Sequence, residues 1–268
     1  SAASDVYKRQ VTVNDVYAFL NEIAPFEYSF SFDNVGILIG NKSAKVDKVL
    51  LSLDLTSEVL EEANQLGVQL VITHHPVIFD PVKSILSDDL LYMVIKSNIS
   101  VISAHTNLDI AENGVNFHLA KALGIKETKA LSEVNFGSKK LPFGFVGSLD
   151  KEYSCKEFAQ FVKRSLNCDG VRYLNLCNKK IKKVAVGSGA CGEFVFEAKK
   201  MNADALITGE IKHHELLFAK ENSICVVDVG HYRSENVVIE PLALMLHRKF
   251  DNVMFFTSTV DIDSMIYL

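Results

Sequence analysis

Short apolar runs of strand length recur along the chain, and each run is followed by polar residues. The run from Val68 to Thr73 is nearly all apolar and rich in β-branched side chains, and Pro76 stops it. Similar runs cover residues 99–104 and 224–229. Continuous apolar runs of this length are typical of parallel strands that are covered on both faces. The pattern therefore predicts buried strands at these three places.

A helical periodicity precedes the first of these strands. Apolar side chains between residues 57 and 66 share one face of a helix: Val59, Leu60, Ala63 and Leu66. Thr56 or Ser57 can cap the start of this helix. Gly67 stands just after its end, where a left-handed backbone conformation is common. With a further apolar run from residue 48, the pattern predicts a strand–helix–strand unit.

This unit occurs twice in the chain. Residues 48–75 and 183–210 match at a constant spacing of 135 residues without a gap, and Glu62 and Glu197 are among the identical pairs. We therefore expect an α/β fold of two pseudo-repeated lobes packed together, each a mixed or parallel sheet flanked by helices. The expected ranges are 11–129 for the first lobe and 130–268 for the second.

The segments outside the repeat differ in character. Between residues 130 and 178, glycine and proline separate short segments, and Ser154 can start a helix there. Residues 1–10 contain no initiator methionine, and we expect them to be a non-native remnant with the natural start near Val11.

Composition and charge narrow the function classes. Of the 268 residues, 48% are hydrophobic and 23% are charged, as in soluble globular proteins. A net charge of −5 argues against a general nucleic-acid binder. No apolar run approaches the roughly 20 residues that span a membrane, and no secretory signal is present. The five cysteines are dispersed without a C-x-x-C pair, which favours reduced packing thiols and a cytoplasmic location.

The first candidate for chemistry is the pair His74 and His75. The two histidines follow the strand predicted at residues 68–73, and ligands in open α/β sheets bind just past the carboxyl ends of strands. Neighbouring strand residues point to opposite faces, so two consecutive ligands fit best where the strand has just ended. Taken alone, the pair is equally compatible with one buried and one surface histidine.

Three more polar clusters follow predicted strands. One runs from His105 to Asp109, although asparagine and aspartate also favour turns. A second places His231 and Glu235 four residues apart, on one face if the segment is helical, although Glu235 can equally belong to an ordinary helix start. The third contains Glu210, His213 and His214, which can contact metal or substrate or simply begin a solvated helix.

A further polar segment, 33–36, has the composition of a turn. Residues 187–192 are glycine-rich and only weakly resemble a phosphate-binding loop, and they more simply open the helix of the second repeat.

Together the clusters favour a metal site. Imidazole and carboxylate ligands without cysteine suit zinc, iron, manganese or cobalt. Five such ligands exceed the needs of one tetrahedral zinc ion, and a carboxylate can bridge two ions. We therefore expect a dinuclear site built from both halves of the chain.

These motifs, in order from Val11 to Leu268, resemble the Nif-three-like dinuclear-metal proteins, often labelled GTP cyclohydrolase I type 2. The segments that carry the resemblance are 33–40, 72–79, 104–109, 207–214 and 230–235. The resemblance implies two similar α/β lobes and a toroidal homohexamer with dinuclear sites facing an inner cavity. The segment 130–178 is too short for the domain that some members insert, so the chain matches the short form. Ser264 stands where the family usually has proline.

Carried over residue by residue, the resemblance implies two divalent ions per subunit, zinc, iron or manganese, held by His74, His75, Asp109, His231 and Glu235. Glu235 is the first candidate for the bridging carboxylate, and Asp109 is the second. Glu210 and His214 are expected nearby as candidate catalytic proton shuttles.

The function that the resemblance implies is metal-dependent hydrolysis of a purine nucleotide such as GTP. Attack at C8 of guanine needs a strong nucleophile, and a metal ion lowers the pKa of bound water toward about 7. Two alternatives use the same residues. One is a non-catalytic hexamer that stores or delivers metal or acts as a scaffold, and the other is a phosphoesterase or peptidase-like hydrolase.

Overall fold

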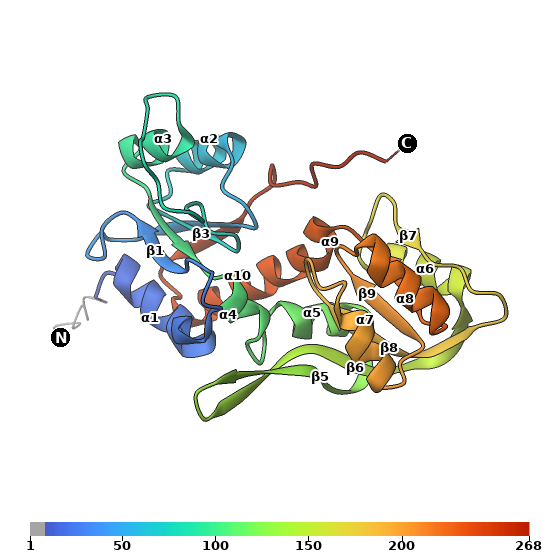
Figure 1. Cartoon of the computed structure of the whole chain (residues 1–268). Coiled ribbons are helices and arrows are strands. Elements are labelled where there is room, and N and C mark those ends of the chain that lie inside the picture. The colour runs from blue at the N-terminus through green and yellow to red at the C-terminus, as the bar shows by residue number, and fades with distance from the viewer. Residues whose placement is uncertain (1–8, 268) are drawn as a thin grey trace, which may run out of the picture. The chain divides into compact units, whose positions relative to one another are not determined.

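The computed structural model describes residues 9–267, so most of the predicted non-native segment 1–10 lies outside the described residues. The described residues form two compact units (Figure 1). Unit 1 contains residues 9–22, 31–105 and 240–261, and unit 2 contains residues 23–30, 106–239 and 262–267.

Unit 1 is built on a five-stranded sheet with the order β1-β4-β3-β2-β11. Its strands are β1 (Gly36–Ile39), β2 (Lys48–Ser52), β3 (Leu70–Thr73), β4 (Ser100–Ser103) and β11 (Met254–Thr257). The last four strands are mutually parallel, and β1 runs antiparallel to β4. Its helices are α1 (Val13–Ile23), α2 (Ser57–Leu66), α3 (Leu90–Lys96) and α10 (Ile239–Lys249).

Unit 2 contains a six-stranded mixed sheet with the order β5-β6-β8-β9-β10-β7. Its strands are β5 (Lys126–Phe136), β6 (Lys139–Ser154), β7 (Arg172–Tyr173), β8 (Lys180–Gly187), β9 (Ala205–Thr208) and β10 (Cys225–Asp228). Its helices are α4 (Thr106–Asp109), α5 (Val115–Ala122), α6 (Cys155–Ser165), α7 (Phe194–Lys200), α8 (His213–Glu221) and α9 (His231–Glu235), with short 3₁₀ turns η1 (Phe26–Tyr28) and η2 (Asn236–Val238).

Alternation along the strands of unit 2 assigns its helices to two faces. Val184 and Val186 pack in one apolar cluster with residues of α5 and α6. Ala185, which lies between them, packs in a second cluster with residues of α7 and α8. Successive strand side chains point to opposite faces, so each face of the sheet has its own core. This arrangement confirms the predicted mixed α/β sheets flanked by helices.

The predicted repeat is present in the structure. The units β2-α2-β3 and β8-α7-β9 are both parallel strand–helix–strand units. Gln69 Oε1 accepts the backbone N–H groups of residues 47 and 48, at 2.9 and 3.0 Å. Asp204 Oδ2, which lies 135 residues further on, accepts those of residues 182 and 183, at 3.1 and 2.9 Å. The two copies therefore share side-chain contacts as well as strand order.

The local signals in the sequence are also confirmed. Thr56 Oγ1 accepts Val59 N–H at the start of α2, and Gly67 has a left-handed backbone with φ of 67° after its end. Ser154 begins α6 through a reciprocal capping box with Glu157. The three predicted buried strands appear as β3, β4 and β10, each slightly shorter than its apolar run.

The division of the chain differs from the predicted ranges 11–129 and 130–268. The boundary between residues 129 and 130 falls inside β5, which pairs with β6 over most of its length. The C-terminal helix α10 and strand β11 belong to unit 1, because β11 pairs in parallel with β2. Within residues 9–267, no helix combines the length and apolar character needed to cross a membrane.

Candidate metal centre

Three histidines come together in unit 1. His74 and His75 follow β3, and His105 follows the neighbouring strand β4. Their ring centroids lie 5.0 to 5.3 Å apart, and one ligand atom from each lies within 4.8 Å of the others. His74 is buried, while His75 and His105 are partly exposed. The carboxyl ends of two parallel strands thus place three nitrogen donors within reach of one ion.

The end of β3 explains how two consecutive histidines serve one group. The parallel ladder continues briefly beyond Thr73, because the N–H groups of His74 and His75 donate to Ser52 O and Leu53 O at 3.2 and 2.9 Å. Thr73 Oγ1 then donates to His75 O at 2.7 Å and closes the chain into a turn. This turn breaks the strand alternation that would otherwise send the two rings to opposite faces.

Each of the three imidazoles has its Nδ1 bonded to an oxygen acceptor. The distances are 2.9 Å from His74 to Ala104 O, 2.9 Å from His75 to Asp54 Oδ1, and 2.9 Å from His105 to Asp33 Oδ1. An oxygen acceptor requires Nδ1 to carry the proton, so in the neutral ring Nε2 keeps its lone pair. Metal-binding histidines commonly have this arrangement, in which the outer partner also fixes the ring orientation.

Unit 2 presents a second group, richer in oxygen. Asp109 ends α4, and His231 and Glu235 are the first and last residues of α9, so the i and i+4 residues share one helical face. Carboxylate oxygens of Asp109 and Glu235 lie within 4.8 Å of each other, and both residues are buried. Two buried carboxylates this close repel each other unless a cation or a proton lies between them. The donor set therefore fits a bound cation.

The geometry of His231 also fits a metal ion. Its Nδ1 donates to Glu210 Oε1 at 2.7 Å, and its Nε2 lies 3.1 Å from Glu235 Oε2. Two ligands that bind one ion at about 2.1 Å, at an angle near 90 to 110°, are about 3.0 to 3.4 Å apart. The separation of His231 and Glu235 falls in this range.

The glycine-rich loop of residues 187–192 supports these carboxylates. Gly189 has a φ of +59°, and a Cβ at this position would lie 2.3 Å from Glu235 Oε1. Ser188 Oγ donates to Asp109 Oδ1 at 3.5 Å, and Gly189 N–H donates to Ser234 Oγ at 2.8 Å. A phosphate-binding role for this loop is disfavoured, because the neighbouring carboxylates would repel a phosphate.

Cys191, in the same loop, is a packing residue. Burial, followed by the charges of Asp109 and Glu235, raises the pKa of its thiol well above the usual value. The thiol therefore stays protonated and is a poor ligand and nucleophile in this environment. None of the histidine and acidic groups found among residues 9–267 includes a cysteine, in line with the hard donor set predicted from the sequence.

The predicted proton shuttles lie in different surroundings. Glu210 contacts His231 and has a side chain that is 60% exposed, so it can orient this imidazole and also faces solvent. The side chain of His214 is 70% exposed and lies 4.0 Å from Glu215. The predicted ligand set draws on both units: His74 and His75 belong to unit 1, and Asp109, His231 and Glu235 belong to unit 2.

The sequence prediction missed three residues that the structure adds to the unit 1 group. The sequence placed His105 only within a strand-end cluster, although it lies two residues past the end of β4, as His75 lies two residues past the end of β3. Asp33 and Asp54, the acceptors of His105 and His75, gave no separate signal because each lies in a turn-like segment. For Asp54, the available indication was its position two residues past the end of β2, the neighbour of β3.

Comparisons with known proteins place this geometry in context. The sequence model of the family described as Duf34/NIF3 (NGG1p interacting factor 3) matches residues 11–263. A Clostridium perfringens protein named GTP cyclohydrolase 1 type 2 homolog is 34% identical over 244 residues, which cover 90% of this chain and 93% of that protein. A Staphylococcus aureus protein with the same name is 26% identical over 365 aligned positions, which cover 96% and 100% of the two chains. This alignment is longer than the present chain, so the Staphylococcus aureus relative carries additional sequence.

A solved structure also matches nearly the whole chain. The crystal structure of a hypothetical protein from Staphylococcus aureus superimposes with a TM-score of 0.90 and 30% sequence identity. The match covers 97% of this chain and 100% of that chain.

Proposed function

Since the chain belongs to the Duf34/NIF3 family, we propose that it is a metal-dependent hydrolase that acts on a purine nucleotide such as GTP. The proposal includes two bound divalent ions, zinc, iron or manganese, held by the histidine and carboxylate groups of the two units. The observation that carries it is the fixed orientation of four histidines, whose Nδ1 atoms all contact oxygen acceptors. The name of the Clostridium perfringens relative supports the choice of GTP.

The chemistry needs a nucleophile, a stabilised negative charge and a route for a proton. Bound divalent ions lower the pKa of a coordinated water and stabilise developing negative charge on oxygen. Among the protein groups, Asp109 and Glu235 supply buried anionic ligands. Glu210 is both exposed and in contact with His231, which suits a group that exchanges a proton with solvent. His214 is the second candidate for this role.

The proposal is tested with GTP and purified protein loaded separately with zinc, iron(II) or manganese. Hydrolysis at C8 of the guanine ring releases formate, and the remaining product can close to a fluorescent pterin. We expect formate from the wild-type protein with at least one metal, and loss of both metal and activity in His74→Ala and Glu235→Gln. His247→Ala is the matched control, since His247 is exposed on α10.

Each outcome bears on a separate part of the proposal. Bound metal without formate for all three ions would contradict the nucleotide hydrolase and favour metal storage or delivery. Absence of stoichiometric metal under every loading condition would contradict the metal centre itself.

The proposal extends to a homohexamer in the cytoplasm. Large apolar side chains are exposed on unit 1 between β3 and the end of α3, among them Phe79, Leu86 and Ile95 at 47%, 61% and 53%. Exposed apolar patches often mark subunit contacts. Free cysteines are compatible with a reducing compartment. Light scattering after gel filtration should give the mass of six chains, and a monomeric mass would contradict this assembly.

A further inference from the structure

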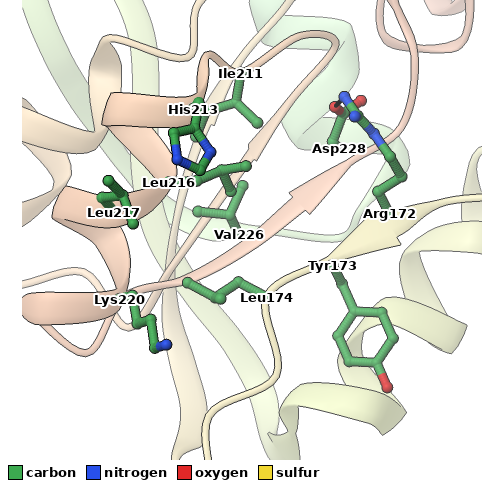
Figure 2. A pocket seen from close by; sticks show the side chains of 10 residues that line it. All are labelled: Arg172, Tyr173, Leu174, Ile211, His213, Leu216, Leu217, Lys220, Val226 and Asp228. Atoms are coloured by element: carbon green, nitrogen blue, oxygen red, sulfur yellow. Dashed lines mark hydrogen bonds and ion pairs between the residues drawn. The ribbon is translucent and has the colours of Figure 1, made fainter.

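Unit 2 contains a hollow of about 240 Å³ that is not part of either metal-binding group. It lies between helix α8, strand β10 and the segment that contains β7, and Figure 2 shows the side chains that line it. A cavity of ~150 Å³ holds one benzene molecule. The hollow therefore has room for an aromatic ring with a short side chain.

The floor of the hollow is apolar. Leu174 and Val226 form it, and Ile211 and Leu216 extend it toward α8 (Figure 2). The backbone groups of this floor are already bonded: Leu174 N–H donates to Val226 O at 2.9 Å, and Leu174 O accepts Cys225 S–H at 3.3 Å. A ligand would therefore be held by shape and apolar contact here, with no hydrogen bonds to the floor.

One face of α8 lines the hollow along its length. His213, Leu217 and Lys220 are separated by four and three residues, the spacing of side chains that share a helical face. Leu217 remains 48% exposed, although it is a large apolar residue. The seven helical rises from His213 to Lys220 span about 10 Å. A ligand can therefore place a charged group at one end of the hollow and an apolar body beside Leu216 and Leu217.

The charges around the hollow are unbalanced. Arg172 is paired with Asp228, so this cation and this carboxylate neutralise each other at one end (Figure 2). Within the part of the chain that the structure describes, Lys220 forms no ion pair. The hollow thus keeps one uncompensated ammonium group beside its apolar floor.

From these features we propose that the hollow binds a small organic carboxylate with an aromatic or branched apolar body, its carboxylate facing Lys220. A single ammonium group matches a monoanion. A phosphate group is normally held by several cations or backbone N–H groups, and here Asp228 balances the charge of Arg172 and the N–H group of Leu174 is bonded. The volume of about 240 Å³ favours a small molecule over an extended peptide.

The test uses 3-phenylpropionate as the probe and its neutral analogue 3-phenylpropionamide. Protein with ¹³C-labelled methyl groups is titrated with each compound, and the shifts of Leu174, Leu217 and Val226 are followed by NMR. We expect saturable shifts with both compounds, and the acid should bind about two- to fivefold more tightly than the amide, the effect of one exposed ion pair.

Variants separate the ammonium group from the cavity. Lys220→Met should abolish the preference for the acid while keeping the binding of the amide, and Lys199→Met, an equal charge change on exposed α7, should leave the preference intact. Leu217→Trp should fill the hollow and remove the shifts for both compounds, with an unchanged melting temperature showing that the chain still folds.

Three results would overturn the proposal. The first is the absence of saturable shifts at these methyl groups, and the second is equal binding of acid and amide by the wild-type protein. The third is a change of these methyl shifts with protein concentration when no probe is present. Such a change would show that a second copy of the chain occupies the hollow.

Discussion

Four histidines in the two candidate metal-binding groups have the same local design. His74, His75, His105 and His231 each bond through Nδ1 to an oxygen atom, and three of the four acceptors are aspartate or glutamate side chains. A carboxylate acceptor fixes the ring and increases the basicity of the opposite nitrogen. The acceptors should therefore contribute to metal affinity without touching the ion.

Substitution of Glu210 tests this contribution. Glu210→Ala removes the acceptor of His231 Nδ1, and we expect metal affinity to fall by about 10- to 100-fold with little loss of stability. Competition against a chromophoric chelator measures the change. Glu221→Ala, which removes an exposed carboxylate at the end of α8, is the control. Equal affinity in the two variants would contradict an orienting role for Glu210.

Gly189 offers a second test at the level of one residue. Gly189 and Gly124 have nearly the same backbone, with φ of +59° and +62°, but only at Gly189 would a Cβ meet Glu235. Each change to alanine should cost about 1 to 2 kcal/mol of folding free energy through backbone strain. Only Gly189→Ala should also displace Glu235 and lose metal, as measured by elemental analysis. Loss of metal in both variants would point to general destabilisation.

How far the site could be predicted depends on how each residue appears in the sequence. His74 and His75 stand out because they follow a long apolar run directly. Asp33 and Asp54 do not, since an aspartate in a turn is common and its partner is distant in sequence. Their partners, His105 and His75, lie 72 and 21 residues away. Such pairings depend on sheet register, which a single sequence does not provide.

At the level of elements, prediction succeeded where a strand is buried and a helix is amphipathic. The runs that became β3, β4 and β10 lie in sheet interiors, and every residue of these three strands is buried. The edge strand β7 has only two residues, both exposed, and therefore leaves no pattern. The terminal strand β11 is partly exposed, and its parallel pairing with β2 joins residues some 200 positions apart.

The repeated unit contains a residue pair whose chemistry differs between the copies. Gln69 and Asp204 bind equivalent backbone N–H groups, but only Asp204 titrates. Burial acts to raise the pKa of Asp204, and hydrogen bonds from Lys183 N–H and Lys179 outweigh it, so the pKa lies below the ordinary value of 3.8. The stabilisation is thus complete above about pH 4 and is lost as the pH falls through the lowered pKa.

Asp204→Asn tests this pH dependence. The amide oxygen can still accept both N–H groups, as Gln69 does, so stability at neutral pH should fall by only about 1 kcal/mol through loss of the ion pair with Lys179. Urea unfolding at a series of pH values should show a smaller loss of stability below pH 4 in the variant than in the wild type. Parallel curves would mean that Asp204 contributes nothing to acid sensitivity.

At the level of the whole molecule, the chain forms unit 1 from segments that lie far apart in sequence. It leaves this unit after residue 105, builds most of unit 2, and returns at residue 240 to add α10 and β11. Composition and repeats cannot reveal such a return, because a strand at either sheet edge has the same local pattern. The parallel pairing of β11 with β2 shows that the returning segment belongs to unit 1.

A fragment of residues 11–129, the predicted first lobe, tests the importance of the returning segment. It lacks α10 and β11 and cuts β5 in the middle, so β2 would expose an unpaired edge and apolar surface. We expect the fragment to lack a cooperative thermal transition by circular dichroism, whereas the full chain unfolds cooperatively. A cooperative fragment would show that the returning segment is dispensable.

The two candidate metal-binding groups differ in their donor atoms, and this difference has a consequence for elemental analysis. Three imidazoles form the group of unit 1, whereas unit 2 supplies two carboxylates and one imidazole. Nitrogen donors favour zinc, and oxygen donors favour harder ions such as manganese. Protein exposed to both zinc and manganese should therefore bind some of each. A measured content of less than one equivalent of either metal would then reflect the selectivity of the two groups and would not indicate contamination.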